Sequence, residues 1–341
     1  MALTNDFAPM DIYAQVEKTG IKGRHFTFID DLSTEELENV FKTALMLEPF
    51  WRSRIPLLQG KVMCLQFFQP STRTRFSMET AMHRLGGDVI TESNPLVSSS
   101  AAKGESLYDS LRVTSQYANV IVLRHPDEGV IDVIAELGAD SAPIISGGYG
   151  DVTHPTQGLL DMYAVYRALG GVFTTMTVMI ATPDLSRARS GQSFGLGLAK
   201  MGARVIYSGT TGLETPQVVR DKLIAMNANF TEVNDLTLSE QEELIVDEGV
   251  DYVYLPGCSV KKGDPGRDDF LKKMAEYYFT AEGLERIQEK TGRTVGISHS
   301  LPRNAGEFDF AIDNTAHQVY FKAIGFSIPL RMSLLANICG I

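Results

Sequence analysis

The sequence predicts an α/β fold with two similar-sized lobes, each a mostly parallel sheet flanked by helices. Short apolar runs typical of buried strands alternate with longer segments of helical spacing, as expected for a parallel sheet with helices on both faces. The pattern starts again near Gly170, and 341 residues are too many for one simple core. We therefore expect two lobes that meet near residues 155–170.

The first lobe begins after an N-terminal arm. Ser33–Leu47 is predicted to be a helix, because Ser33 or Thr34 can cap it and acidic residues occupy its first turn. The elements expected next are a strand at Val62–Phe68, a helix from Ser71 or Thr72 to Leu85, a strand at Asp88–Thr91, a helix over Ser106–Tyr117, a strand at Val120–Leu123, a helix over Gly129–Leu137 and a strand at Pro143–Ile145. The segment Gly147–Asp151 (GGYGD) is predicted to be a glycine-rich turn.

The second lobe is predicted to follow the helix Thr156–Leu169. Its expected elements are strands at Thr177–Ala181, Arg204–Tyr207, Asn229–Val233 and Asp251–Tyr254, with helices at Gly191–Met201 and Pro216–Met226. Thr315–Ile338 is apolar on one side and is predicted to be helical and to pack back on the first lobe. The expected domains are therefore residues 1–155 together with the C-terminal helix 313–341, and residues 156–312.

Bulk composition excludes several classes of protein. The net charge of -11 argues against a broad nucleic-acid-binding face. No apolar run is long enough to cross a bilayer, and the first residues lack a basic start and an apolar core, so we expect a cytoplasmic protein without membrane association. Three scattered cysteines predict neither a disulfide framework nor a zinc site, and Cys64 is expected to fill core space.

The segment Phe67–Arg75 (FFQPSTRTR) has the pattern of a phosphate-binding site. An apolar strand ends at Gln69–Pro70, and the helix that follows directs unpaired N–H groups and its positive dipole end at whatever lies in front. Hydroxyl and guanidinium groups suited to phosphate oxygens come from Ser71, Thr72, Arg73, Thr74 and Arg75. An ordinary capped helix with solvated arginines fits the local pattern equally well.

Three further residues in the first lobe are candidates for chemistry. Lys103 lies on a small, polar, glycine-bearing loop, where it can reach an anionic substrate or simply be solvated. Arg124 stands at the C-terminal end of a strand, the position at which open parallel sheets place ligand-binding groups. His154 precedes a helix, where a ring N–H can polarise a carbonyl oxygen, although a lone histidine is more often structural.

The second lobe adds two candidate segments. Arg187 and Arg189 follow the strand Thr177–Ala181 and are expected in a loop at its C-terminal end. Leu301–Pro302 has a fixed backbone that can offer a carbonyl to an attacking amine. Together with the first-lobe residues, these describe a cleft between two lobes that is lined by arginines, a histidine and a lysine.

These motifs resemble the aspartate/ornithine carbamoyltransferase family, and most closely its aspartate branch. The matching segments run in order from about residue 30 to the C-terminal end: PSTRTRFSMETAMHRLGG (Pro70–Gly87), KGESLYDSLRV (Lys103–Val113), VLRHPDEG (Val122–Gly129), HPTQGLLDMY (His154–Tyr163), HSLPR (His299–Arg303) and YFKAIGFSIPLRMSLLANI (Tyr320–Ile338). The resemblance implies transfer of the carbamoyl group of carbamoyl phosphate to an amine, without a metal or organic cofactor.

The resemblance also implies roles for individual residues. Four residues would hold the phosphate of carbamoyl phosphate: Ser71, Thr72, Arg73 and Thr74. Arg124 would bridge the phosphate and the carbonyl, and His154 would donate to the carbamoyl oxygen. Gln157 and the backbone of Leu301, next to Pro302, would hold the carbamoyl amide. Ser99 and Lys103 match a loop supplied by a neighbouring subunit, which implies a homotrimer with shared active sites and leaves room for a higher assembly.

The acceptor amine is less closely specified. Arg189 matches the arginine that holds the α-carboxylate of aspartate, which favours L-aspartate and a role in pyrimidine biosynthesis. However, Gly257 and Ser259 stand where the aspartate branch carries an arginine and a glutamine, and Lys261 or Lys262 would have to substitute for the missing charge. The alternative is therefore a carbamoyltransferase for a different amino compound.

Two readings from other classes remain. The first is a non-catalytic homologue that binds phosphate ligands, against which the retained Arg73, Lys103, Arg124 and His154 argue. The second is a nicotinamide dehydrogenase, but GLGLAKMG (Gly195–Gly202) is predicted to lie within a helix and lacks the order of strand, glycine loop and helix.

Overall fold

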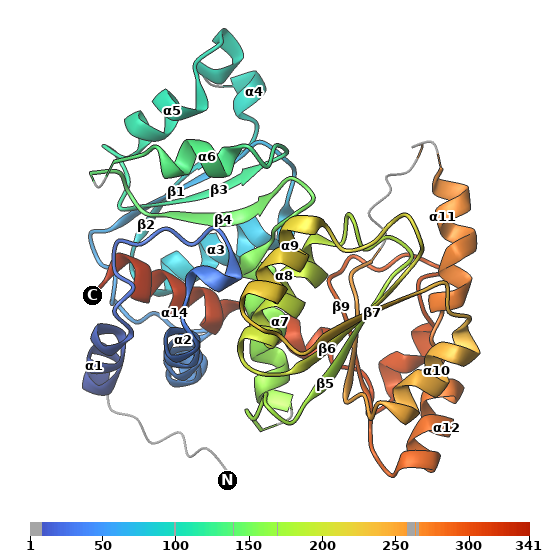
Figure 1. Cartoon of the computed structure of the whole chain (residues 1–341). Coiled ribbons are helices and arrows are strands. Elements are labelled where there is room, and N and C mark those ends of the chain that lie inside the picture. The colour runs from blue at the N-terminus through green and yellow to red at the C-terminus, as the bar shows by residue number, and fades with distance from the viewer. Residues whose placement is uncertain (1–8, 99, 139, 169, 258–262, 264–265) are drawn as a thin grey trace. The chain divides into compact units, whose positions relative to one another are not determined.

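The computed structural model of the chain describes residues 9–341, apart from residues 99, 139, 169, 258–262, 264 and 265. The chain divides into two compact units, one formed by the residues up to Thr156 together with Gly325–Ile341, the other by Gln157–Ile324. Each unit is built on a parallel sheet with flanking helices (Figure 1), which confirms the predicted α/β class with two lobes.

The first unit is built around the sheet order β2-β1-β3-β4, in which all neighbours are parallel. Its strands are β1 (Val62–Phe67), β2 (Asp88–Glu92), β3 (Val120–His125) and β4 (Ile144–Tyr149). Its helices are α1 (Pro9–Thr19), α2 (Thr34–Leu47), α3 (Thr72–Arg84), α4 (Pro95–Ser98), α5 (Leu107–Thr114), α6 (Val130–Ala135) and α14 (Ser327–Cys339).

Both faces of this first sheet are covered. Figure 1 shows α5 and α6 on one side of the sheet, and α2 and α14 on the other. Alternate strand residues such as Cys64, Ile121 and Leu123 join the buried cluster that includes Leu111 of α5 and Ile134 of α6, as the two-residue period of a strand requires. Because α14 packs on α2 and α3, the prediction that the last helix packs back on the first lobe is confirmed, but residues 313–324, which were expected with it, belong to the second unit.

The start of α2 shows how local sequence sets an element. Ser33 is the N-cap residue, and its hydroxyl accepts a hydrogen bond from the Glu36 N–H at 3.2 Å, while the Glu36 carboxylate accepts from the Ser33 N–H at 2.7 Å. This reciprocal capping satisfies two N–H groups that the helix itself cannot pair. The predicted N-terminus at Ser33 is therefore correct.

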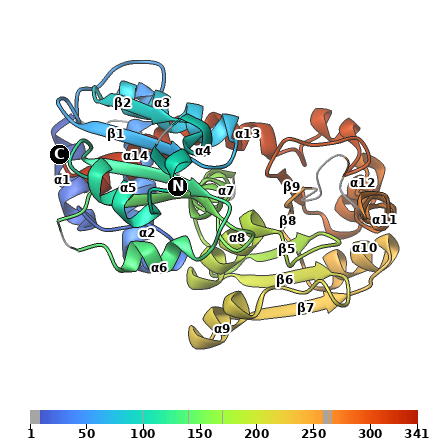
Figure 2. The same ribbon diagram turned by 90° about the horizontal axis from the view of Figure 1, so that it is seen from above.

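The second unit is built around the sheet order β7-β6-β5-β8-β9, again parallel throughout. Figure 2 shows β5, β6 and β7 side by side. The strands are β5 (Thr177–Ala181), β6 (Arg204–Gly209), β7 (Phe230–Asn234), β8 (Tyr252–Leu255) and β9 (Gly296–His299). The helices are α7 (Pro155–Ala168), whose first two residues belong to the first unit, and α8 (Arg189–Lys200), α9 (Gln217–Ala225), α10 (Leu238–Asp247), α11 (Arg267–Lys273), α12 (Ala281–Thr291) and α13 (Tyr320–Gly325).

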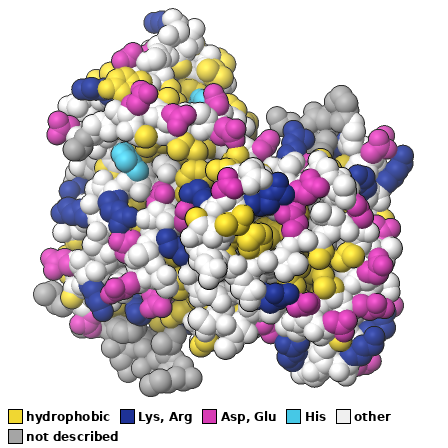
Figure 3. Space-filling view, in the orientation of Figure 1, with side chains coloured by type: hydrophobic (Ala, Val, Ile, Leu, Met, Phe, Trp, Pro, Cys, Tyr) yellow, Lys and Arg dark blue, Asp and Glu magenta, His cyan; other side chains and the backbone are white. Residues whose placement is uncertain are grey.

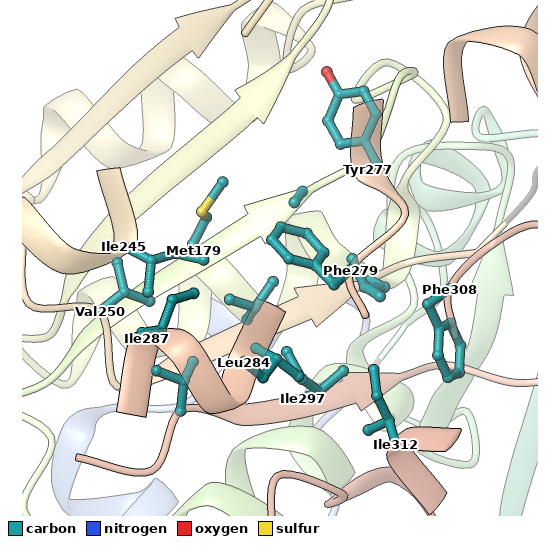
Figure 4. Packing of buried hydrophobic residues seen from close by; sticks show 14 of the residues in the cluster. Met179, Ile245, Val250, Tyr277, Phe279, Leu284, Ile287, Ile297, Phe308 and Ile312 are labelled. Carbon is teal, nitrogen blue, oxygen red and sulfur yellow. The ribbon is translucent and has the colours of Figure 1, made fainter. Parts of the chain in front are cut away.

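The core of the second unit joins its sheet to α10 and α12. Figure 4 shows Met179 and Ile297 of the sheet packed among the side chains of Ile245 of α10 and Leu284 of α12. The hydroxyl of Tyr277 leaves this apolar cluster and donates to the Gly209 carbonyl at 2.7 Å, so the one polar atom of that ring is satisfied where it is buried.

The C-terminal stretch differs from the prediction of one helical segment over Thr315–Ile338. Gln318 forms a parallel bridge with Ile297 of β9, in which the Ile297 N–H donates to the His317 carbonyl at 2.6 Å and the Val319 N–H donates to the Ile297 carbonyl at 2.9 Å. Helix α13 starts only after this pairing, at Tyr320, and α14 follows as a separate helix. Backbone pairing with a strand therefore outweighs the helical pattern at the start of this segment.

The surface carries charges of both signs. Figure 3 shows acidic and basic side chains interspersed on one face of the molecule rather than gathered by type. Within the residues that the structure describes, no helix is both long and apolar enough to span a membrane.

Candidate functional site

The C-terminal ends of β1, β3 and β4 form the edge of the first sheet on which the predicted phosphate site lies. Phe67 of β1 pairs with Arg124 of β3, and the Phe68 N–H donates to the Arg124 carbonyl at 2.8 Å. The regular pairing of β3 with β4 is interrupted between Leu123 and His125, at Arg124 itself. Helix α3 begins shortly after β1, and such strand ends are the usual position of ligand sites in open α/β sheets.

Arg124 is a buried cation whose side chain lies along this sheet edge. Only 9% of the residue is exposed. Its Nη1 donates to the Gly147 carbonyl at 2.7 Å and lies 3.3 Å from Nε2 of His154. The structure therefore brings together two of the predicted site residues, Arg124 and His154.

The hydrogen bonds around His154 assign its tautomer. Nδ1 lies 3.3 Å from Oγ1 of Thr156, whose hydroxyl donates to the Ser146 carbonyl at 3.1 Å. With that hydroxyl proton engaged, Nδ1 must carry the ring proton and donate to Thr156. Nε2 then has a lone pair and accepts from Arg124, which can only donate. That His154 donates a hydrogen bond to a substrate oxygen stays a prediction. In this tautomer Nε2 carries no proton and cannot be the donor.

Glycines 147 and 148 let the β4 backbone approach these two side chains, and only Gly150 and Asp151 of the predicted turn Gly147–Asp151 lie in a turn. Both residues lie within β4, which extends to Tyr149. A Cβ on Gly148, at φ +112°, would lie 3.1 Å from Arg124 Nη1 and 3.4 Å from the His154 ring. Gly148 therefore lacks a side chain so that the backbone can lie close to Arg124 and His154, and not because the chain reverses direction there.

The N-terminus of α3 provides the other part of the predicted phosphate site. Ser71 is the N-cap residue, at the predicted helix start, but its side chain makes no capping hydrogen bond. Thr72 and Arg73 are exposed, whereas Thr74 is buried. Partial desolvation lowers the pKa of the Arg73 guanidinium, which nevertheless stays a cation near neutral pH. The helix end thus presents N–H groups, hydroxyls and a positive charge together.

The loop that carries Lys103 forms short helical turns. Lys103 is exposed and ends the 3-10 turn Ser100–Lys103, which follows α4. Ser99, predicted to act with it, lies outside the described residues, as do Lys261 and Lys262.

Gln157 is held within the first turns of α7. Its Nε2 donates to both carboxylate oxygens of Asp161, at 3.0 and 3.1 Å, and the Tyr254 hydroxyl donates to Asp161 Oδ2 at 2.7 Å. Asp161 is 1% exposed. A buried carboxylate thus links the predicted amide-binding residue to β8, the strand that leads to Gly257.

The predicted acceptor residue Arg189 belongs to the second unit and is the first residue of α8, not a loop residue as expected. Arg187 does lie in the loop before it and is exposed. Arg189 thereby stands at a helix N-terminus, where the helix dipole also favours an anion.

Leu301 has a backbone conformation that neighbouring side chains stabilise. Its φ is +52°, and the peptide bond to Pro302 is cis. The Leu301 N–H donates to Nδ1 of His299 at 2.9 Å, and Nε2 of His299 lies 3.2 Å from Oε2 of the fully buried Glu307. Burial raises the pKa of Glu307, but hydrogen bonds from His299 and Asn304 outweigh burial and leave the pKa below its usual value. The carbonyl predicted to serve the reaction therefore follows a backbone that is held by His299, whose ring in turn contacts the buried Glu307 carboxylate.

Gly257 lies against the same histidine. Its φ is +83°, and a Cβ at this position would lie 3.0 Å from both Cε1 and Nε2 of His299. A larger residue at 257 would thus strain the backbone and displace the His299 ring.

Several supporting residues were not found from the sequence. Thr156, Asp161, His299 and Glu307 act on the predicted residues rather than as obvious ligands. A signal existed for Asp161, since it is the one acid within the apolar run Leu159–Val165 of a predicted helix, and such an acid must be paired if buried. His299 offered none beyond its place in the motif HSLPR.

Among the described residues, no group of three or more histidine, cysteine, aspartate and glutamate side chains could hold a metal ion.

Comparison with known proteins identifies the class of enzyme to which this fold belongs. Residues 24–167 match the family model described as the aspartate/ornithine carbamoyltransferase, carbamoyl-P binding domain. A ureidoglycine carbamoyltransferase of Rubrobacter xylanophilus is 49% identical over 96% of both chains. The aspartate carbamoyltransferase catalytic subunit of Methanothrix thermoacetophila is 35% identical over 93% of this chain and 99% of its own.

Solved structures agree with this class. The catalytic subunit of M. jannaschii aspartate transcarbamoylase matches with a TM-score of 0.76 and 34% identity over 93% of this chain and 99% of its own. Aspartate transcarbamoylase from Trypanosoma cruzi, in complex with carbamoyl aspartate and phosphate, matches with a TM-score of 0.77 and 25% identity over 94% of this chain and 97% of its own. The chain belongs to the aspartate/ornithine carbamoyltransferase family.

Proposed function

We propose that this enzyme transfers the carbamoyl group of carbamoyl phosphate to the amine of an acceptor with one carboxylate and a neutral, hydrogen-bonding side group, with ureidoglycine as the leading candidate. The observation that carries this choice is Gly257, packed against His299 where the resemblance calls for an arginine. The 49% identity to a ureidoglycine carbamoyltransferase supports the same choice.

The donor would bind at the first sheet edge. The phosphate would accept from the α3 N-terminus, from Ser71, Thr72 and Thr74 and from Arg73, with Lys103 approaching from a neighbouring subunit of a homotrimer. Arg124 would bridge the phosphate and the carbamoyl oxygen. The amide of the carbamoyl group would contact Gln157 and the Leu301 backbone.

His154 has a conditional role in this scheme. To donate to the carbamoyl oxygen from Nε2, the ring must take a second proton, or Thr156 must turn its hydroxyl from Ser146 to Nδ1 so that the single ring proton moves to Nε2. Arg124 Nη1 already carries donor protons. Arg124 is therefore the first source of stabilisation for charge on the carbamoyl oxygen.

The chemistry is an addition followed by an elimination. The uncharged amine attacks the carbamoyl carbon, and a C–N bond forms while negative charge collects on the carbamoyl oxygen. The C–O bond to phosphate then breaks with its electron pair leaving on the phosphate, and the surplus amine proton passes to a phosphate oxygen. Arginines and helix N–H groups held in place before the reaction stabilise this charge without reorganising.

Charge at the acceptor side distinguishes the candidate acceptors. Aspartate carries two carboxylates, whereas ureidoglycine carries one carboxylate, one amine and an uncharged ureido group on a single carbon. Arg189, at the N-terminus of α8, would pair with the one carboxylate. A second arginine at 257 is absent, so a second carboxylate would be desolvated without a cation from that position, which is unfavourable. Carbamoyl transfer to ureidoglycine would yield an acetate that carries two ureido groups.

L-Aspartate remains the second candidate, with N-carbamoyl-L-aspartate as product, because relatives at 34 to 36% identity are named aspartate carbamoyltransferases.

The test is turnover of isotope-labelled carbamoyl phosphate with a panel of amines: freshly prepared ureidoglycine, L-aspartate, L-ornithine and glycine. Phosphate release and product mass are both recorded. We expect kcat/KM for ureidoglycine to exceed that for aspartate by at least about 100-fold, since unpaired buried charge is a strong basis for rejection. Faster turnover of aspartate than of ureidoglycine would contradict the proposal. The variant Gly257→Arg serves as the matched control, and we expect it to lose ureidoglycine turnover without gaining aspartate turnover.

A further inference from the structure

The pair formed by Gln157 and Asp161 determines which way the Gln157 amide faces. The two residues are four positions apart on α7, so their side chains lie on the same face of the helix. The Gln157 Nε2 lies 3.0 and 3.1 Å from the two carboxylate oxygens. An ionised carboxylate can only accept hydrogen bonds, so the NH2 end of the amide must face Asp161 and the Gln157 carbonyl oxygen must face away from it.

Tyr254 stabilises the ionised form of Asp161 by donating a hydrogen bond to it. Its hydroxyl donates to Asp161 Oδ2 at 2.7 Å. Burial, and then the nearby Asp161 charge, raise the pKa of Tyr254 well above its usual value, so the phenol stays protonated and remains a donor. Asp161 is 1% exposed, so water does not readily replace either partner. Asp161 thus receives N–H and O–H donors from two elements, α7 and β8.

We infer that Asp161 is a specificity-determining positioning residue, which turns the Gln157 carbonyl oxygen towards the carbamoyl NH2 and so makes the enzyme select carbamoyl phosphate over acyl phosphates such as acetyl phosphate. The inference rests on the contact of Gln157 with the carbamoyl amide in the proposed function. A carbamoyl NH2 can donate to this carbonyl oxygen, whereas an acetyl CH3 in the same place leaves the oxygen desolvated and without a donor.

The alternative orientation of the amide would reverse this preference. If the Gln157 NH2 faced the substrate, it would oppose the carbamoyl NH2, since both groups only donate at that contact. Asparagine at 161 can present either its oxygen or its NH2 to Gln157, so it would no longer fix the amide orientation. Replacing the carboxylate by a carboxamide therefore isolates the orienting effect with almost no change in shape.

The test uses two hydrolysis-resistant ligands that differ only in the group at issue, phosphonoacetamide (NH2) and acetonylphosphonate (CH3), titrated by calorimetry without acceptor. We expect wild-type protein to bind phosphonoacetamide at least about tenfold more tightly than acetonylphosphonate. In Asp161→Asn this ratio should fall to about threefold or less, with the Kd for inorganic phosphate unchanged. Tyr254→Phe, which keeps the carboxylate, is the matched control and should retain most of the wild-type ratio.

Each outcome has a definite meaning. A tenfold or larger ratio retained in Asp161→Asn overturns the inference, as does wild-type protein that binds both phosphonates equally. Wild-type protein that binds neither phosphonate nor phosphate contradicts the proposed function together with the inference. If Asp161→Asn does not fold, as judged by its thermal midpoint, Asp161→Ser carries the same expectation, because a hydroxyl can also donate or accept. Failure to find an acceptor leaves this comparison intact, since no acceptor is present.

Discussion

At the scale of single residues, Arg124 combines burial, charge and contact with the histidine. Its Nη1 serves the Gly147 carbonyl and Nε2 of His154 at once, which a forked, planar guanidinium can do. A lysine carries the same charge as a single point on a flexible stem, so it would not reproduce both contacts. The position therefore depends on the shape of the cation as well as its charge.

We predict that Arg124→Ala lowers kcat by about 100-fold or more and weakens phosphate binding, because a donor to charged oxygens in a buried site is lost. The Gly147 carbonyl and His154 lose a buried donor, so the free energy of unfolding should fall by about 1–3 kcal/mol. Compared with Arg124→Ala, Arg124→Lys should restore more of the lost stability than of the lost kcat. Steady-state phosphate release and thermal unfolding measure these effects.

The matched control for this prediction is Arg112→Ala. Arg112 is an exposed arginine of α5 that donates to the Tyr108 hydroxyl at 3.1 Å, outside the proposed site. Its replacement should leave turnover within about twofold of wild type, as is usual for surface positions. Equal loss of activity in both variants would show that net positive charge, not the Arg124 contacts, supports catalysis.

Sequence reasoning found the candidate site residues more readily than the residues that hold them in place. Arg124 and His154 were predicted from a strand end and a helix start, and the structure places them 3.3 Å apart. Asp161 and Glu307 escaped because their partners come from elsewhere in the chain or depend on burial, which one sequence does not reveal. The assigned roles of the site residues stay predictions.

At the scale of elements, β4 shows why a local pattern can mislead. Gly147 and Gly148 look like turn residues, yet they continue a buried strand alongside Arg124. Glycine occurs both in turns and where a strand must pass close to another side chain. The sequence alone does not show which of the two applies, because the neighbouring side chain comes from elsewhere in the chain. Strands β1, β3, β5 and β6 were predicted because each contains a run of at least three apolar residues, whereas β9 has only four residues, Gly296–His299, two of them polar.

Helix α10 was missed although its start carries a usable signal. Thr237 caps it, and Glu240 completes a capping box with hydrogen bonds at 2.8 and 3.3 Å. Serine or threonine followed three residues later by glutamate predicts a helix N-terminus, as Ser33 and Glu36 also show at the start of α2. Applied consistently, this rule would have placed α10 from the sequence.

We predict that Gly148→Ala lowers kcat/KM by about tenfold, because a Cβ 3.1 Å from Arg124 Nη1 must displace the guanidinium. The residue also has φ +112°, so the variant should lose about 1–3 kcal/mol of stability. Gly138→Ala is the control, since its Cβ would meet nothing within 4 Å. Activity of Gly148→Ala equal to that of Gly138→Ala would contradict a constraint on Arg124.

At the scale of the whole molecule, the proposed homotrimer with shared sites makes a quantitative prediction. Lys103→Ala and Arg124→Ala chains should each be nearly inactive alone. In mixed trimers, a complete site needs Arg124 from one chain and Lys103 from its neighbour. Each trimer that contains both variants has one such site of three, so doubly tagged trimers should show about one third of wild-type activity.

Coexpression of the two variants with different affinity tags provides the mixed trimers for this assay. Each variant carried through the same procedure alone is the control. Doubly tagged trimers that remain as inactive as the single variants would contradict sharing of sites between chains.

The contribution of α14 to the first unit has a consequence for how the protein matures. Arg331 of α14 is 2% exposed and donates through Nη1 to the carbonyl of Thr156, the residue whose hydroxyl contacts Nδ1 of His154. On the ribosome, the whole of Gln157–Ile324 emerges before Gly325–Ile341 does. The nascent chain can therefore complete its second unit first, and the first unit, which carries Arg124 and His154, is completed only once these helical turns leave the exit tunnel.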